Sequence, residues 1–248
     1  MRGDADTSEQ LLAELLSVGQ HAAGARAFFT ERGLSEADML SLLRLAVPVA
    51  FLEAVASTSP WSERPRVLGG VCLNPKAPRS LAQRLLPGLY WRDLVDAAAS
   101  PRVDAGVRAR AEALLKERLP DLRLGEKITL ARLATAGVLR PLLQESDPRI
   151  LEAALQNPRL SESALSGMVQ SAEASRPLLE TVAAAPRWRA SYAVRLALVL
   201  QPRTPMGIAL AQLTSLQDHD LRRIAAHPGL RPVIQAAAGR VAAEGRRR

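Results

Sequence analysis

The chain has 248 residues, of which 48% are hydrophobic and only 3% aromatic, and its net charge at pH 7 is +8. Its apolar residues are mainly Ala, Leu and Val, and Ala and Leu are strong helix formers, so the composition favours a mostly helical protein with ample material for a core. The single cysteine excludes an intrachain disulfide framework and a Cys-rich metal site, and no apolar run is long enough to cross a membrane.

The N-terminal region begins with polar residues and has no apolar stretch behind them, which predicts no signal peptide and a cytoplasmic protein. Residues 1–44 do not align with the rest of the chain but contain an apolar stripe at Leu11, Leu12, Leu15 and Leu16. We expect them to form an N-terminal helical cap, because a terminal repeat otherwise exposes its apolar face. The C-terminal residues 244–248 are expected to fray.

Apolar residues recur at helical spacing along the whole chain, and no segment alternates with a period of two. The sequence therefore predicts helices and no strands. The expected helices are 8–19, 22–31, 36–45, 48–57, 63–73, 79–87, 91–99, 102–118, 127–135, 137–145, 148–156, 161–171, 175–185, 188–200, 205–213, 218–226 and 230–244.

The chain contains a long internal repeat. Segment 51–117 aligns without gaps with 178–244, at an offset of 127 residues, and about 20 of the 67 aligned positions are identical. The matched residues include Trp61/Trp188, Pro75/Pro202, Asp93/Asp220 and Leu94/Leu221. The positions predicted to be core are Leu94/Leu221, Ala98/Ala225, Val107/Ile234 and Ala111/Ala238.

Two interleaved series of prolines divide this interval into steps of about 42 residues, a spacing typical of two-helix repeats. One series is Pro75, Pro120, Pro158 and Pro202, and the other is Pro101, Pro148, Pro186 and Pro228. Proline is tolerated at a helix start but disrupts a helix interior, so each proline predicts a helix boundary. Ser100 and Asp147, each directly before a proline, are expected to be N-cap residues.

The motifs "NPKAPRSLAQRLL", "DPRILEAALQNP" and "NPRLSESALSGMV" resemble bacterial HEAT-like repeats and the related leucine-rich repeat variant. The resemblance implies a right-handed, armadillo-like α-solenoid of HEAT-like two-helix repeats over 45–248, following the cap. Such stacks usually serve as binding surfaces.

A search for catalytic chemistry predicts no enzyme and no catalytic, cofactor-binding or metal-binding residues. The sequence contains no phosphate-binding glycine motif. His21, His219 and His227 lack the spacing of a helical metal pair, and Cys72 has the apolar context of a buried residue. Asp93 and Asp220 are expected to cap helices, since a catalytic acid is not normally copied into both repeats.

Arginines gather on the second helix of each unit, which in HEAT-like stacks usually lines the concave face. An arginine ladder there predicts an acidic or phosphate-bearing partner. The alternative is that the arginine content, with only three lysines, reflects base composition alone. The candidate partner-binding residues, with Trp91 and Arg92 as a candidate hot spot, are Arg102, Arg108, Arg149, Arg187, Arg189, Arg195, Trp91 and Arg92.

Three functions remain open from the sequence. The first is a non-enzymatic scaffold for an unidentified, acidic protein partner. The second is a nucleic-acid-binding solenoid with a basic concave face, similar to the HEAT-like DNA glycosylases, although their active-site acid and aromatic cradle match no position here. The third is an accessory to an enzyme, such as a solenoid chaperone or lyase, which requires a deep pocket.

Overall fold

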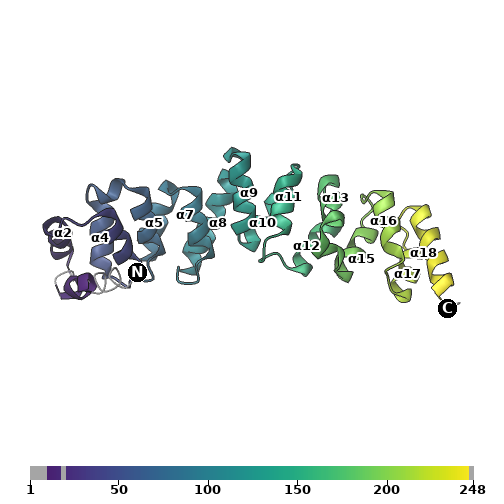
Figure 1. The fold of residues 1–248 in the computed structure, drawn as a ribbon, viewed down its shortest axis with the longest axis horizontal. Helices are drawn as coiled ribbons and strands as arrows, with labels where there is room; N and C mark the ends of the chain where they lie inside the picture. Colours follow the sequence, from purple (N-terminus) through teal and green to yellow (C-terminus); the bar gives the residue numbers. More distant parts are fainter. Residues whose placement is uncertain (1–9, 18–20, 246–248) are drawn as a thin grey trace. The chain divides into compact units, whose positions relative to one another are not determined.

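The computed structural model describes residues 10–17 and 21–245, and within these ranges it contains helices and turns but no strand. Contacts divide the chain into two compact units, Met1–Asp121 and Leu122–Arg248, and each unit is described by itself. The helices are short and pack mainly against near neighbours in the chain (Figure 1). The all-α prediction is therefore confirmed, and the pairwise packing is consistent with a helical repeat.

Residues 10–17 of the first unit are helical. They are followed by α2 (Ala22–Glu31), α3 (Glu36–Leu43), α4 (Val49–Ser57), η1 (Trp61–Glu63), α5 (Pro65–Leu73), α6 (Arg79–Leu85), η2 (Leu86–Gly88), α7 (Trp91–Ala99), α8 (Ala105–Arg118) and η3 (Leu119–Asp121). The predicted boundary between cap and repeat at 44/45 falls inside this unit, where α2 packs on α4 and α3 on α5. The assignment of 1–44 as a cap stays a prediction.

The second unit contains α9 (Leu124–Leu133), α10 (Ala136–Leu142), α11 (Pro148–Leu155), α12 (Glu162–Gln170), α13 (Arg176–Ala184), α14 (Pro186–Arg189), α15 (Tyr192–Leu200), α16 (Met206–Leu213), α17 (Asp218–Ala225) and α18 (Pro232–Gly245). From α11 onward, it repeats the order of α2 to α8, whereas α9 has no counterpart among the described helices of the first unit. Helices α13 to α18 lie at the 127-residue offset from α4 to α8, as the sequence alignment predicts.

The correspondence extends further toward the N-terminus than the sequence alignment. Helices α11 and α12 begin close to the 127-residue offset from α2 and α3. The packing partners correspond as well, because α2 packs on α4 as α11 packs on α13, and α3 packs on α5 as α12 packs on α15. The two units are therefore copies of one helix arrangement, including part of the segment whose sequence does not align.

The prolines of both series lie at helix junctions, as predicted. Pro148 and Pro186 are the first residues of α11 and α14, and the others lie in turns or in η3. Asp147 caps α11, since its side chain accepts a hydrogen bond from the Arg149 N–H at 2.9 Å. These prolines act at the helix ends because a proline ring supplies no N–H for the helix interior.

Several predicted boundaries are wrong. The helix expected over 127–135 begins at Leu124, and the one expected over 137–145 ends at Leu142. The helix expected over 102–118 begins at Ala105, because the Asp104 side chain caps it by accepting from the N–H groups of Gly106 and Val107. Ser100, which was expected to be an N-cap residue, is instead the C-cap residue of α7. The helix expected over 188–200 is interrupted, because the Ser191 side chain accepts from the backbone of the new helix α15 and starts it there.

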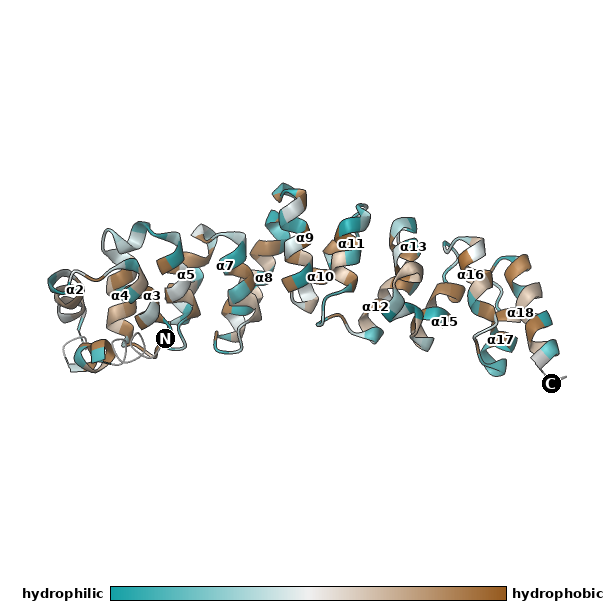
Figure 2. Ribbon diagram, in the orientation of Figure 1, coloured by the Kyte–Doolittle hydropathy of each residue, from teal (hydrophilic) through white to brown (hydrophobic). Residues whose placement is uncertain are grey.

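Most of the predicted core positions are buried. Seven of the eight paired positions are buried, including Leu94 at 0% and Leu221 at 3% exposure, whereas Ala225 is only partly buried. Within each unit, hydrophilic residues gather toward the turns and hydrophobic ones along the packed helices (Figure 2). Leu15 of the predicted N-terminal stripe is buried, whereas Leu16 is 43% exposed.

Three buried side-chain amides join neighbouring helices, and the sequence analysis missed them. Asn74 donates to the carbonyls of Leu43 and Leu45 at 2.8 and 2.7 Å. Asn157 and Gln201, at corresponding positions before prolines, make the same kind of double contact to the ends of α9 and α12. Because buried carbonyls left without partners are costly, these amides fix where one helix ends against the next.

Candidate functional site: an arginine-lined pocket in the first unit

Several of the predicted partner-binding arginines bond to the chain itself. Arg187 donates to the carbonyls of Asn157 and Leu160, both at 3.2 Å, and stacks 4.3 Å from the centre of the Trp188 ring. Arg149 pairs with the cap residue Asp147, with 2.8 Å between Nη2 and Oδ2. Both arginines therefore stabilise helix junctions of the second unit.

The remaining predicted residues are divided between the two units. Arg189 is exposed on α14, and Arg195 lies half-buried beside the Tyr192 ring. Arg108 donates to the carbonyl of Val103. Trp91 is half-buried at the start of α7, with the Arg92 guanidinium 6.0 Å from its ring centre.

Two of the predicted residues line pockets: Arg187 lines a hollow of the second unit, and Arg102 lines one of the first. A hollow of about 510 Å³ in the first unit is lined by Arg102, by Arg44 after α3 and by Arg66 near the start of α5. Arg102 reaches it from the turn between α7 and α8, where its N–H is held by the Ser100 hydroxyl at 3.3 Å. Its guanidinium donates to the carbonyl of Arg44 at 3.2 Å, so the two arginines lie together.

Two adjacent glycines of α5 form the wall of this pocket beside the carboxylate of Asp93. A Cβ atom added to Gly69 would lie 3.2 Å from Cγ of Asp93, and one added to Gly70 would lie 3.0 Å from Cδ1 of Leu43. Glycine here permits the close approach of α5 to α7 and α3. The shape of the pocket therefore depends on these two glycines, as its charge depends on the arginines and Asp93.

Asp93 lies in the pocket as a half-buried acid, and the expectation that it is the N-cap residue of α7 is wrong. It is the third residue of α7, whose N-cap is Tyr90. Burial raises the pKa of the Asp93 carboxyl, and the nearby charge of Asp96 raises it further, while the Tyr90 N–H and Arg66 oppose this shift. Behind it, burial and then the charge of Asp93 raise the pKa of the Cys72 thiol to about 12, so this cysteine is inert near neutral pH.

The equivalent aspartate of the second unit has a different environment. Asp220 is also the third residue of its helix rather than the N-cap, and it is 3% exposed. The Tyr192 hydroxyl donates to it, and the side chains of His219 and Arg223 lie at 3.3 and 3.2 Å from its oxygens. Asp220 is therefore a fully partnered buried acid.

At the 127-residue offset, the pocket of the first unit has no counterpart. The positions of Arg44, Arg66 and Arg102 are occupied by Ser171, Ala193 and Gly229. Leu196 stands at the position of Gly69. The second unit therefore keeps the acid but lacks the cations and the glycine wall that make the pocket.

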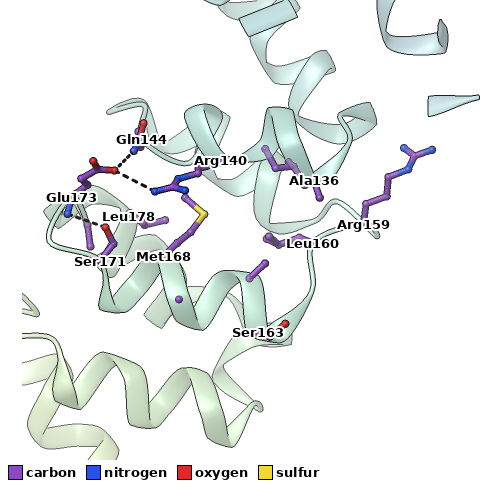
Figure 3. A pocket seen from close by; sticks show the side chains of 14 residues that line it. Ala136, Arg140, Gln144, Arg159, Leu160, Ser163, Met168, Ser171, Glu173 and Leu178 are labelled. Carbon is purple, nitrogen blue, oxygen red and sulfur yellow. Dashed lines mark hydrogen bonds and ion pairs between the residues drawn. The ribbon is translucent and has the colours of Figure 1, made fainter. Parts of the chain in front are cut away.

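A second hollow, of about 350 Å³, lies beside α10 and α12 in the second unit (Figure 3). Its charged side chains contact one another across the opening: Glu173 accepts from Gln144 at 2.6 Å and lies 3.9 Å from Arg140. Met168 and Leu160 supply apolar lining. Arg159 also lines this hollow, and its guanidinium donates to the Leu133 carbonyl at 2.8 Å.

A third hollow, of about 490 Å³, lies beside Trp188. The Trp188 indole donates to the Leu155 carbonyl at 2.8 Å, and both Trp188 and its equivalent Trp61 are buried in the core. At the positions of Leu155 and Gln156, the first unit has two buried phenylalanines that pack edge-on against Phe51. The larger rings occupy space that is open in the second unit.

Within the ranges that the structure describes, no three His, Cys, Asp or Glu side chains lie together as a metal site requires, and no helix is long and apolar enough to cross a membrane. No family model matches the chain, and neither the curated proteins nor the solved structures include a significant match. The resemblance to HEAT-like repeats therefore stays a hypothesis.

Of the residues that line the arginine pocket of the first unit, only Arg102 was predicted from the sequence as a binding residue, and Arg44, Arg66 and Asp93 were not. These residues come from three helices, and none follows a recognisable motif. A signal was nevertheless present in the sequence. Three arginines of the first repeat or just before it align with small residues of the second, whereas the aspartate is retained.

Proposed function

We propose that this chain is a non-enzymatic scaffold that binds other proteins, built as a right-handed α-solenoid of HEAT-like two-helix repeats. One observation carries the proposal: the two units share one helix arrangement but present different hollows. The first unit has an arginine-lined pocket, whereas the second has a hollow beside Trp188. A repeat protein that keeps its helix arrangement but changes the residues that line its hollows can contact a partner at several different points.

The local packing supports the architectural part of this proposal. Each unit places helices side by side in chain order, and buried amides tie each turn to the preceding helix end. A stack built this way supplies a long surface without a catalytic pocket. The protein partner is expected to be acidic, because the open arginines lie in the first unit and the net charge is +8.

Binding of nucleic acid is the second candidate, and the net charge of +8 is the observation that favours it. A phosphate track requires a row of available arginines. Arg149 and Arg187 are instead bonded within the second unit, which favours the protein-binding proposal.

Parallel binding measurements test the proposal. The purified protein is immobilised and exposed to a cell extract, and the retained proteins are identified by mass spectrometry. A matched bait carries Gly69→Leu and Ala184→Trp, which fill the arginine pocket and the hollow beside Trp188. We expect the wild type to retain specific proteins that this bait loses.

A separate titration with random-sequence duplex DNA measures the alternative. DNA binding that weakens steeply with salt would favour the nucleic-acid function instead. Identical protein sets on both baits would contradict a scaffold that uses these hollows.

A further inference from the structure

We propose that the arginine pocket of the first unit binds the carboxylate of an acidic peptide segment that carries a neighbouring apolar side chain. This inference rests on the proposed protein-binding function and specifies which chemistry the partner presents. The pocket is lined by Arg44, Arg66 and Arg102 around Asp93.

The first argument is that these guanidinium groups have unused hydrogen-bonding capacity. With respect to the described residues, the side chains of Arg44 and Arg66 form no hydrogen bond and no ion pair within 4 Å. Arg102 uses one of its five N–H donors, on the carbonyl of Arg44. Elsewhere, Arg149 and Arg176 are paired with carboxylates. The pocket therefore gathers cationic donors that have no carboxylate of their own in hydrogen-bonding contact.

The second argument is the fit to a carboxylate. A guanidinium is a planar fork of N–H donors that matches a carboxylate through two parallel hydrogen bonds. Arg44, Arg66 and Arg102 belong to three different helices or turns and line one hollow. A carboxylate bound there would replace its hydrogen bonds to water by charge-assisted hydrogen bonds to these guanidinium groups.

The third argument is that Asp93 lines the same pocket and favours a peptide over a nucleic acid. Its carboxylate accepts hydrogen bonds, and a peptide backbone offers N–H donors beside its acidic side chain, whereas a phosphodiester backbone offers none. Nucleic acid also needs a track of phosphate contacts, whereas these arginines converge on one hollow.

The fourth argument is the apolar part of the lining. Leu40, Leu43 and Leu73 line the pocket together with the charged residues. A pocket with apolar walls and a few converging polar groups is typical of specific recognition. An acidic residue next to an apolar residue therefore matches the lining better than a purely acidic run.

The experiment is a selection from random peptides displayed on phage, with the full-length protein as the target. We expect the selected peptides to be enriched in Asp or Glu next to an apolar residue. One selected peptide is then labelled with fluorescein, and its affinity is measured by anisotropy. A version with Gln for Glu or Asn for Asp is measured beside it and should bind at least about tenfold more weakly, since charge-assisted hydrogen bonds are the stronger ones.

The pocket variant takes its residues from the second unit: Arg44→Ser, Arg66→Ala and Arg102→Gly together. We expect its affinity for the selected peptide to fall by at least about tenfold. A charge-matched control replaces three exposed arginines of the second unit, Arg132→Ala, Arg203→Ala and Arg240→Ala. It should change the affinity by less than about threefold, because only screened long-range charge is lost.

A second pocket variant fills the pocket without removing any charge, and its folding is checked separately. Gly69→Leu keeps all three arginines but introduces the side chain found at the equivalent position in the second unit. We expect it to weaken peptide binding while thermal melting followed by circular dichroism still shows a cooperative transition. If this variant melts without cooperativity, the arginine variant alone decides the outcome.

Three results would overturn the inference. The first is a selected consensus without acidic residues, and the second is equal affinity of the wild type and the arginine variant. The third is duplex DNA binding that depends on the same arginines while no acidic peptide is selected. Peptides that bind elsewhere would leave the scaffold function standing, whereas the absence of any protein or peptide ligand would remove both proposals.

Discussion

Asp93 and Asp220 occupy the same position of the repeat but have opposite environments. Asp220 is buried and bonded by Tyr192, His219 and Arg223. At those three offsets the first unit has Pro65, Arg92 and Asp96, of which Asp96 adds repulsion instead of a partner. The comparison shows that a repeat can keep a side chain while reassigning it from packing to an open pocket.

The phenylalanines of the first unit give the converse lesson. Phe28 and Phe29 are buried against Phe51, whereas Leu155 and Gln156 at their positions line an open hollow. Each unit therefore lines its hollow with residues that the other unit replaces. Side chains at a few positions differ, while most helices of the two units correspond.

The largest expected effect tests whether the two cores are equivalent. Leu94→Ala and Leu221→Ala should each lower the free energy of unfolding by about 2–5 kcal/mol, the cost of a cavity in a packed core. Urea denaturation followed by circular dichroism measures both, with Val49→Ala at a 41% exposed position as the control. A loss below about 1 kcal/mol in one unit would show that its helices are not packed as described.

The buried amides are expected to matter next. Asn74→Ala and Asn157→Ala each leave two carbonyls without their side-chain donor, which should cost about 2–3 kcal/mol. The same denaturation assay applies, with the exposed Gln170→Ala as control. Neutral behaviour of either asparagine variant would mean that water replaces the amide and that it does not fix the helix junction.

Asp220→Asn should destabilise the protein by about 1.5–3 kcal/mol, because a carboxylate with charged partners makes stronger hydrogen bonds than an amide does. Tyr192→Phe supplies the matched comparison, since it removes one of the donors while keeping the ring. Thermal melts at neutral pH measure both variants. Equal melting temperatures of Asp220→Asn and the wild type would contradict the role of Asp220 as a structural acid.

Asp93→Asn should stabilise the protein, whereas Asp220→Asn should destabilise it. The pKa of Asp93 is raised above its ordinary 3.8 in the folded state, so ionisation costs stability as the pH rises through the folded-state pKa. The variant should therefore melt slightly higher than the wild type at neutral pH, and the difference should vanish as the pH falls below 3.8. A lower melting temperature at neutral pH would show that the Asp93 carboxylate stabilises the first unit.

The smallest expected effect concerns Cys72, which lies beneath the pocket of the first unit at the position of Val199 in the second. With burial and a pKa near 12, its thiol should react with Ellman's reagent at pH 8 only as the protein unfolds. The reaction is measured with and without denaturant. Rapid modification of the folded protein would indicate that the glycine wall opens.

The sequence by itself determined the helices, most of their ends and the buried stripes. Proline and capping side chains act locally, and apolar spacing is read directly from the chain, so Asp147, Pro186 and Leu94 could be placed without coordinates. The 127-residue repeat likewise fixed which helices correspond.

Only the tertiary structure decided what meets across the helices. Whether Arg187 binds a partner or the carbonyls of Asn157 and Leu160 depends on how closely two turns approach, and this distance is not a local property of the sequence. Arg44, Arg66 and Asp93 likewise become one pocket only because Gly69 and Gly70 let three helices pack closely. Burial and the convergence of charges arise from packing, and for that reason the pocket could not be derived from helical periodicity.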